Sequence, residues 1–302
     1  MDTIAATTFP ANVAGDPVHH RTLEVQGTSV FYREAGAPQA PAVLLLHGFG
    51  ASSHMFRNLI PQLARHYHVI APDLPGFGQT TTPPDFRYTF DNLAEVIDAF
   101  TTAKGLARYA IYVFDYGAPV GWRLAVKHPQ KISAIVSQNG NAYEEGLSAG
   151  WADMRKAWAE PTAANREALR RFNTPDMLRW QYTEGVRDTS LIAPETYQLA
   201  AAAIDRIGVE PQMDLLLDYG SNVAQYPELH AFFRRHQPPT LAIWGRNDPF
   251  FTPPGAEAFR RDNPQAEVRF LDTGHFAIET HGDEIAAAML AFLERSIGSG
   301  TQ

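Results

Sequence analysis

Three side chains capable of nucleophilic or acid–base chemistry each follow a strand-like run. The runs are residues 110–114, 240–244 and 267–271, and the side chains that follow them are Asp115, Asp248 and His275. A carboxylate can attack carbon or orient a base, and an imidazole exchanges protons near neutral pH. In open α/β sheets, reactive groups lie at the carboxyl ends of the strands.

The turn around Asp115 is the most informative of these three places. Gly117 lets the chain turn tightly behind Asp115, and Pro119 fits the first turn of a helix, where its missing N–H costs nothing. The start of that helix favours a charged carboxylate. Asp115 could therefore be a reactive group, or it could simply cap the helix.

Composition limits the classes of protein that fit. The 302 residues are 45% hydrophobic and 19% charged, which predicts a globular chain with a large core. The net charge of -8 argues against a nucleic-acid partner, which would need a basic face. There is no cysteine, which excludes disulfides, thiolate metal sites and a cysteine nucleophile. No run is long enough to span a membrane, and residues 1–20 lack the pattern of a signal peptide, so we expect a cytoplasmic protein.

Strand-like and helix-like segments alternate through most of the chain. We expect strands at residues 22–25, 29–33, 42–46, 68–71, 110–114, 132–137, 240–244 and 267–271. We expect helices at residues 55–65, 93–103, 119–127, 255–261 and 285–297. This alternation predicts an α/β fold, with a mostly parallel eight-stranded sheet and helices on both faces.

Residues 141–236 break the alternation. They contain no strand-like run and have helical patterns at residues 151–158, 165–172 and 195–204. We interpret this segment as a helical cap domain inserted between two strands. The predicted core domain then comprises residues 20–140 and 237–298, and residues 1–19 form an N-terminal extension.

The segment Val113-Phe114-Asp115-Tyr116-Gly117 resembles the nucleophile elbow of the α/β-hydrolase superfamily, and the resemblance extends over nearly the whole chain. Val113 stands where serine hydrolases have glycine, and Asp115 stands where they have serine. Both departures are usual in the branch that contains epoxide hydrolases and haloalkane dehalogenases. The resemblance implies that Asp115 attacks a saturated carbon and that water then hydrolyses the resulting ester.

The same resemblance assigns the partners of Asp115. The superfamily's chain order is nucleophile, acid and then histidine, so Asp248 would be the acid and His275 the base that activates water. Glu144 is a reserve acid, because some relatives place theirs after the preceding strand. The segment from Leu46 to Gly50 resembles the oxyanion loop, which implies that the backbone N–H groups of Phe49 and Tyr116 stabilise the intermediate.

Two reactions share these groups and differ in the leaving group. An epoxide needs an O–H donor, which epoxide hydrolases supply from cap tyrosines; here Tyr219 is the first candidate and Tyr182 the second. A halide needs N–H donors, and dehalogenases place a tryptophan directly after the nucleophile. This chain has Tyr116 at that position, although Trp151 or Trp158 could hold a halide instead.

We therefore predict an epoxide hydrolase that converts apolar epoxides to vicinal diols. Cap aromatics and Phe250 are expected to line an apolar pocket, in which Trp151 and Trp158 also lie. The partners are a small apolar substrate and water; no cofactor, metal, nucleic acid or membrane is implied, and both a monomer and a homodimer are compatible with the sequence. The alternatives are a haloalkane dehalogenase with the same triad and a non-catalytic small-molecule binder of the same fold.

Overall fold

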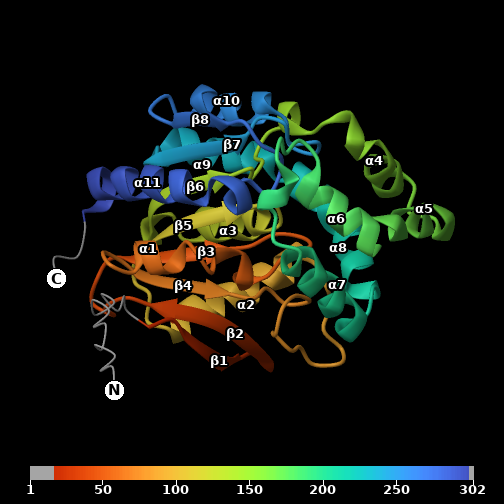
Figure 1. Cartoon of the computed structure of the whole chain (residues 1–302), viewed down its shortest axis with the longest axis horizontal. Helices are drawn as coiled ribbons and strands as arrows, with labels where there is room; N and C mark the ends of the chain where they lie inside the picture. The colour runs from red at the N-terminus through yellow and green to blue at the C-terminus, as the bar shows by residue number, and fades with distance from the viewer. Residues whose placement is uncertain (1–16, 299–302) are drawn as a thin grey trace, which may run out of the picture.

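The computed structural model describes residues 17–298, and its centre is one eight-stranded sheet (Figure 1). The strands lie in the order β1-β2-β4-β3-β5-β6-β7-β8. Their bounds are β1 His19–Val25, β2 Thr28–Ala35, β3 Ala42–Leu46, β4 His68–Pro72, β5 Tyr109–Phe114, β6 Ile132–Gln138, β7 Thr240–Gly245 and β8 Glu267–Leu271. The strand β2 pairs antiparallel with both β1 and β4, and the remaining pairs are parallel. The predicted α/β fold class is confirmed.

Helices cover both faces because the central strands are apolar on both sides. Along β5, Tyr109, Ile111 and Val113 face one core cluster, and the residues between them face the other. The helices α2 (Phe90–Ala103), α3 (Gly117–Lys127) and α10 (Pro253–Asp262) contribute to the first cluster. The helices α1 (Ile60–Leu63) and α11 (Ala277–Ile297) contribute to the second.

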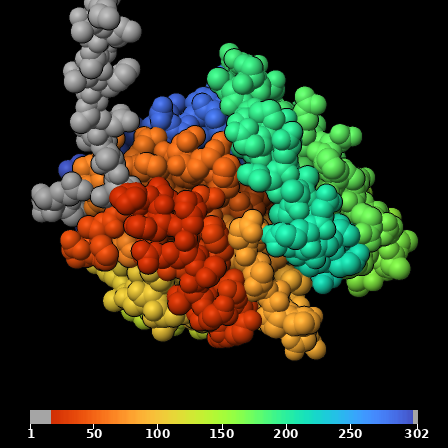
Figure 2. Space-filling model, turned by 60° about the horizontal axis from the view of Figure 1, so that its bottom comes forward, coloured from red at the N-terminus to blue at the C-terminus, as the bar shows by residue number. Residues whose placement is uncertain are grey.

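Between β6 and β7 the chain is helical, as predicted for residues 141–236, which we call the insertion. Its helices are α4 Ala152–Ala159, α5 Ala163–Ala168, α6 Pro175–Thr183, α7 Glu195–Ile207, α8 Glu210–Ala224 and α9 Tyr226–His236. In Figure 1 the helices α4 to α8 lie together beside the sheet, whereas α9 packs on α3 and α10. Figure 2 shows the green and teal part of the insertion as one block next to the orange loop between β4 and α2.

Polar contacts hold α8 to the core. The Asp218 carboxylate accepts the backbone N–H of Phe90 at the start of α2, at 2.7 Å. The Arg123 guanidinium on α3 donates to Asn222 Oδ1 at 2.7 Å and to Ser221 Oγ at 3.2 Å. Because α3 begins directly after Asp115, the same helix is joined to the predicted nucleophile and to the insertion.

Some predicted boundaries differ from the structure. The helix expected at residues 55–65 is a 3₁₀ turn, Ser53–Phe56, followed by the short α1, which has Pro61 in its first turn. The last helix begins at Ala277, earlier than predicted, with a kink at His281. Of the predicted N-terminal extension, residues 1–16 lie outside the described residues, and β1 already begins at His19.

Candidate active site

The backbone at Asp115 has the conformation of a tight strand-to-helix turn. Its φ is 47°, in the left-handed region that non-glycine residues rarely adopt. Two glycines allow the loop after β3 and the turn after β5 to approach each other closely. A Cβ at Gly48 would lie 2.5 Å from the Asp115 Cβ, and a Cβ at Gly117 would lie 2.3 Å from the Leu46 carbonyl oxygen. The turn therefore presents the Asp115 side chain directly to the loop after β3.

The Asp115 carboxylate is buried and held by backbone donors. Its Oδ1 accepts the N–H of Phe49 at 2.6 Å, and the N–H of Tyr116 also stabilises its charged form. Burial raises the pKa of Asp115 above its ordinary value, although these N–H groups and the nearby His275 oppose the shift. The sequence predicted these two N–H groups as the oxyanion hole; the Phe49 N–H forms a hydrogen bond to the carboxylate, and the Tyr116 N–H lowers the pKa of Asp115.

His275 lies between the two aspartates. Its Nε2 is 3.8 Å from Asp115 Oδ2, too far for a hydrogen bond, and its Nδ1 is 2.7 Å from Asp248 Oδ2. Burial alone lowers the pKa of His275, but the charges of Asp248 and Asp115 and the hydrogen bond to Asp248 outweigh it, so the net pKa is raised. The three side chains of the predicted triad thus come together, whereas Glu144 pairs with Arg155 at the surface.

Asp248 is itself fully hydrogen-bonded. Its Oδ1 accepts the N–H groups of Phe250 and Phe251, at 2.7 and 3.1 Å. Its Oδ2 accepts the Asn139 amide at 2.6 Å in addition to the His275 ring. Four donors thus fix the carboxylate beside one nitrogen of the imidazole, which orients the other nitrogen toward Asp115.

Asn139 is a site residue that the sequence analysis missed. It directly follows β6 with a φ of 48°, and its Oδ1 accepts the N–H of Gly245 at 2.9 Å. Asparagine tolerates this left-handed conformation better than most residues, and its amide joins the ends of β6 and β7. Its position at a strand end, next to an apolar run, was the signal that could have found it.

A narrow cavity of about 30 Å³ opens in front of Asp115. Its wall is mostly apolar and comes from the core loops, the insertion and the loop after β7. The lining residues are Phe49, Asp115, Tyr116, Trp151, Met154, Phe172, Gln181, Leu216 and Phe250. The predicted pocket residues Trp151 and Phe250 are among them. The apolar chemistry of this lining suits a small apolar molecule, but at about 30 Å³ the cavity is smaller than a ligand site, so a substrate needs the lining side chains to move apart.

The indole N–H groups near this cavity are already engaged. Trp151 donates to the Phe250 carbonyl at 3.0 Å, and Trp158 donates to the Leu216 carbonyl at 2.9 Å. Trp158 does not line the cavity, contrary to the prediction; it stacks on Tyr219. Since each indole has one donor, neither ring has an N–H left for a halide in this arrangement.

Tyr219, the first predicted proton donor, does not line the cavity itself but packs directly behind two residues that do, Trp151 and Tyr116. Its ring is 4.5 Å from that of Trp151 and 5.8 Å from that of Tyr116, and the side chain is 1% exposed. The hydroxyl of Tyr226 accepts the Asn141 amide at 3.1 Å. Burial raises the pKa of Tyr219 well above its ordinary value, and the charges of Tyr226 and Asp115 add to the shift. The phenol therefore remains protonated and is electrostatically coupled to Asp115.

Tyr182, the second predicted proton donor, lies elsewhere. Its hydroxyl donates to the Gly50 carbonyl at 2.8 Å, and its ring stacks on Phe276 with centroids 3.6 Å apart. It is not among the cavity's lining residues; its neighbour on α6, Gln181, lines the cavity instead. The side chain of Tyr182 therefore holds α6 to the core and is not placed to protonate a substrate at Asp115.

The described part of the chain has neither a metal-binding cluster nor a membrane-spanning helix. Within residues 17–298, no three His, Asp or Glu side chains lie close enough together to hold a metal ion. No helix in this range is long and apolar enough to cross a membrane.

Comparisons with known proteins agree with this geometry. The family model for the alpha/beta hydrolase fold matches residues 41–282. An uncharacterized hydrolase of Saccharomyces cerevisiae is 44% identical over 278 residues, which are 90% of this chain and 96% of the yeast protein. Haloalkane dehalogenase 2 of Mycobacterium tuberculosis is 29% identical, with 91% of this chain and 94% of that protein covered.

A solved structure is similar over the same extent. The crystal structure of an epoxide hydrolase from Vigna radiata has a TM-score of 0.72 and 25% identity, and the match covers 92% of this chain and 98% of that one. The chain therefore belongs to the alpha/beta hydrolase fold family, in the branch that contains the haloalkane dehalogenases and epoxide hydrolases.

Proposed function

We propose that this hydrolase opens small apolar epoxides to vicinal diols through a covalent ester on Asp115. The observation that carries the proposal is the arrangement of Asp115, His275 and Asp248 beside an apolar cavity whose indole N–H groups are bound to carbonyls. This arrangement supplies a nucleophile and a base, but it leaves no indole donor for a halide.

In the first step Asp115 Oδ2 attacks one epoxide carbon. The Phe49 N–H holds Oδ1, so Oδ2 is the oxygen free to react. A carbon–oxygen bond forms to the enzyme, and the bond from that carbon to the epoxide oxygen breaks. The leaving oxygen remains on the substrate as an alkoxide and takes a proton from Tyr219, whose phenol is neutral and coupled to Asp115.

In the second step water hydrolyses the ester. His275 Nε2 removes a proton from the water, whose oxygen attacks the Asp115 carboxyl carbon. The N–H groups of Phe49 and Tyr116 stabilise the negative oxygen of the tetrahedral intermediate. Its collapse expels the diol as an alkoxide, which takes the proton from His275, while Asp248 stabilises the imidazolium during the step. The reaction leaves Asp115 as a carboxylic acid and Tyr219 as a phenolate. Water carries the proton from the Asp115 acid to the Tyr219 phenolate, which returns both groups to their starting states.

Removal of the base should trap the ester. We expect His275→Ala treated with styrene oxide to gain the mass of one intact epoxide, on the peptide that contains Asp115, in intact-protein and peptide mass spectra. Asp115→Asn should gain nothing, and His66→Ala, at an exposed position, should turn over without accumulating an adduct.

The same experiment tests the dehalogenase alternative. The similarity to haloalkane dehalogenase 2 is the observation that favours it. With 1-bromobutane, the His275→Ala protein would gain a butyl group and release bromide if the chain were a dehalogenase. If the His275→Ala protein forms an adduct with 1-bromobutane but not with styrene oxide, the substrate is an alkyl halide and not an epoxide. If it forms an adduct with neither compound although the wild-type enzyme is active, the covalent mechanism is wrong.

The proton donor can be tested separately. Tyr219→Phe should lower kcat/KM for styrene oxide by about 10² to 10⁴-fold, because the alkoxide then leaves without a general acid. Tyr182→Phe is the matched control, since it removes a buried hydroxyl of the same kind that is bonded to Gly50, and it should retain nearly full activity. Equal losses in the two variants would contradict the assignment of Tyr219.

A further inference from the structure

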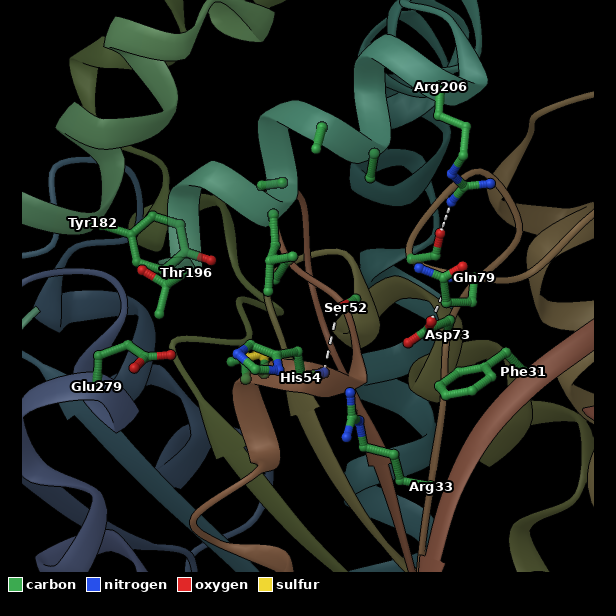
Figure 3. A pocket seen from close by; sticks show the side chains of 17 residues that line it. Phe31, Arg33, Ser52, His54, Asp73, Gln79, Tyr182, Thr196, Arg206 and Glu279 are labelled. Carbon is green, nitrogen blue, oxygen red and sulfur yellow. Dashed lines mark hydrogen bonds between the residues drawn. The ribbon is translucent and has the colours of Figure 1, made fainter. Parts of the chain in front are cut away.

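A second, larger pocket lies away from Asp115, between α7 of the insertion and the core. Its volume is about 290 Å³, and it shares no lining residue with the cavity at Asp115. In Figure 3, α7 crosses above the pocket, and Arg33 and Asp73 face it from the core below. Tyr182, bonded to Gly50, stands at one edge. The volume is at the lower end of ligand sites, which span about 300 to 1,000 Å³.

The acidic groups of this pocket are committed to protein donors. Asp73 Oδ1 accepts the N–H of Ser53 and Oδ2 accepts the N–H of Gln79, both at 2.7 Å. The Glu279 carboxylate forms a two-bond pair with Arg57, at 3.1 and 2.7 Å. These carboxylates therefore have donors of their own and do not need a cationic ligand.

Two guanidinium groups in the pocket, those of Arg33 and Arg206, have no oppositely charged partner within the described residues. Among residues 17–298, neither Arg33 nor Arg206 has a carboxylate oxygen within 4.0 Å. Arg33 bonds Ser53 Oγ at 3.1 Å and the His20 ring at 2.7 Å, and Arg206 donates to the Gly78 carbonyl. Neither guanidinium thus has a carboxylate as a hydrogen-bond partner in this range, although the charge of Asp73 acts on Arg33. Arginine N–H groups in a cleft form their strongest bonds with carboxylate or phosphate oxygens.

A third polar group, the His54 ring, lies in the same pocket and can donate from Nε2 in one of its two neutral tautomers. His54 Nε2 is buried and has no hydrogen-bond partner in the described part of the chain. Burial and the positive charges of Arg57 and Arg33 lower the pKa of His54, so the ring is neutral at pH 7. A buried polar nitrogen without a partner is costly, and a ligand that bonds to it would remove that cost.

The rest of the wall is apolar. The helix α7 contributes small and aliphatic side chains, and the core contributes Phe31 and Met55. Leu199 on α7 is 48% exposed at this place, a large fraction for leucine beside a pocket. A ligand with a short hydrocarbon tail would cover this surface, whereas a small inorganic anion would leave it exposed.

We propose that this pocket binds a small carboxylate with a short aliphatic tail. The carboxylate contacts Arg33, Arg206 and His54, and the tail lies along the apolar face of α7. Since Arg206 belongs to the insertion and Arg33 to β2, the ligand joins the insertion to the core and stabilises the folded protein. The proposal is independent of the reaction at Asp115.

Calorimetric titration of the whole chain tests it, with hexanoate as the probe. We expect one hexanoate to bind per chain, and hexanol, acetate and inorganic phosphate to bind at least tenfold more weakly. Arg33→Gln and Arg206→Gln should each weaken hexanoate binding by tenfold or more. Arg235→Gln, which removes an exposed arginine from α9, should leave it unchanged.

Two further variants separate this pocket from the cavity at Asp115. Ala203→Leu fills the pocket without changing any charge and should abolish hexanoate binding, with an unchanged circular dichroism spectrum as evidence of folding. Asp115→Asn should bind hexanoate normally, whatever the outcome of the trapping experiment. The proposal would be overturned if hexanol or phosphate bound as tightly as hexanoate. It would also be overturned if neither Arg33→Gln nor Arg206→Gln changed the affinity for hexanoate.

Discussion

The Asp115 carboxylate combines features that stability alone would not select. It is an ionisable group at 6% exposure, on a residue with a positive φ, and burial raises its pKa. Backbone strain of this kind costs on the order of 1 to 3 kcal/mol and is commonly found at functional sites. A helix cap would need neither the burial nor the nearby imidazole. These features therefore favour the reactive interpretation of Asp115 over the structural one.

The role of Asp248 gives a prediction at the residue scale. Asp248→Asn should lower turnover by about 10³ to 10⁴-fold, because the imidazole loses both its orientation and the charge that stabilises its protonated form. The pKa of His275 is raised above the ordinary value of 6.5, so the wild-type activity should fall as the pH drops through a point above 6.5. In the variant that point should move to lower pH, since burial then dominates.

Steady-state rates across pH measure both effects. Asp272→Asn is a suitable control, because Asp272 lies in the same loop as His275 but pairs with Arg187 at the surface. If the activity of Asp248→Asn falls at the same acidic pH as that of the wild-type enzyme, Asp248 does not raise the pKa of His275.

At the scale of single elements, the loop after β3 must approach β5 closely. Gly48→Ala should reduce activity by at least tenfold, because the new methyl group would lie 2.5 Å from the Asp115 Cβ and displace the side chain. Gly282→Ala is the control, since a Cβ there meets no atom within 4 Å and alanine favours the helix. Comparison of kcat/KM with the thermal midpoint separates loss of geometry from loss of folding.

The elements also show what sequence patterns can and cannot predict. All eight strands were found: the central ones, such as β3 and β5, are short apolar runs, and the outer ones, such as β1 and β8, are β-like runs bounded by turn residues. The sequence named Tyr182 as the second proton donor, but its neighbour Gln181 on α6 lines the cavity instead, because adjacent helical residues point about 100° apart and both are buried. Only the contact of α6 with Gly50 and Phe276 decides which one faces the cavity. Asn139 was missed for a similar reason, since its partner Asp248 is 109 residues away.

At the scale of the whole molecule, the site should make stability depend on pH. The folded-state pKa values of His275 and Asp115 are both raised, so the folded protein holds protons more tightly than the unfolded chain does. Stability from His275 is then present below pH 6.5 and is lost as the pH rises through its raised pKa. Asp115 acts in the same direction, over a range that starts near pH 3.8.

We therefore expect the wild-type protein to lose more stability than His275→Gln when the pH rises from about 6.5 to above neutrality. Urea denaturation at a series of pH values measures the difference in the free energy of unfolding. Parallel curves for the two proteins would mean that the pKa of His275 is the same in the folded and unfolded chains.

The contacts of α8 with α2 and α3 bear on how the insertion could be exchanged between relatives. Arg123 and the backbone of Phe90 belong to the core, but their acceptors, Ser221, Asn222 and Asp218, belong to the insertion. The N–H at residue 90 is a backbone group that any residue except proline supplies, but a chimera cut at the ends of the insertion would leave the Arg123 side chain, on the helix that follows the nucleophile, without its acceptors. Recombination that changes substrate range should therefore succeed when residue 123 is inherited together with the insertion.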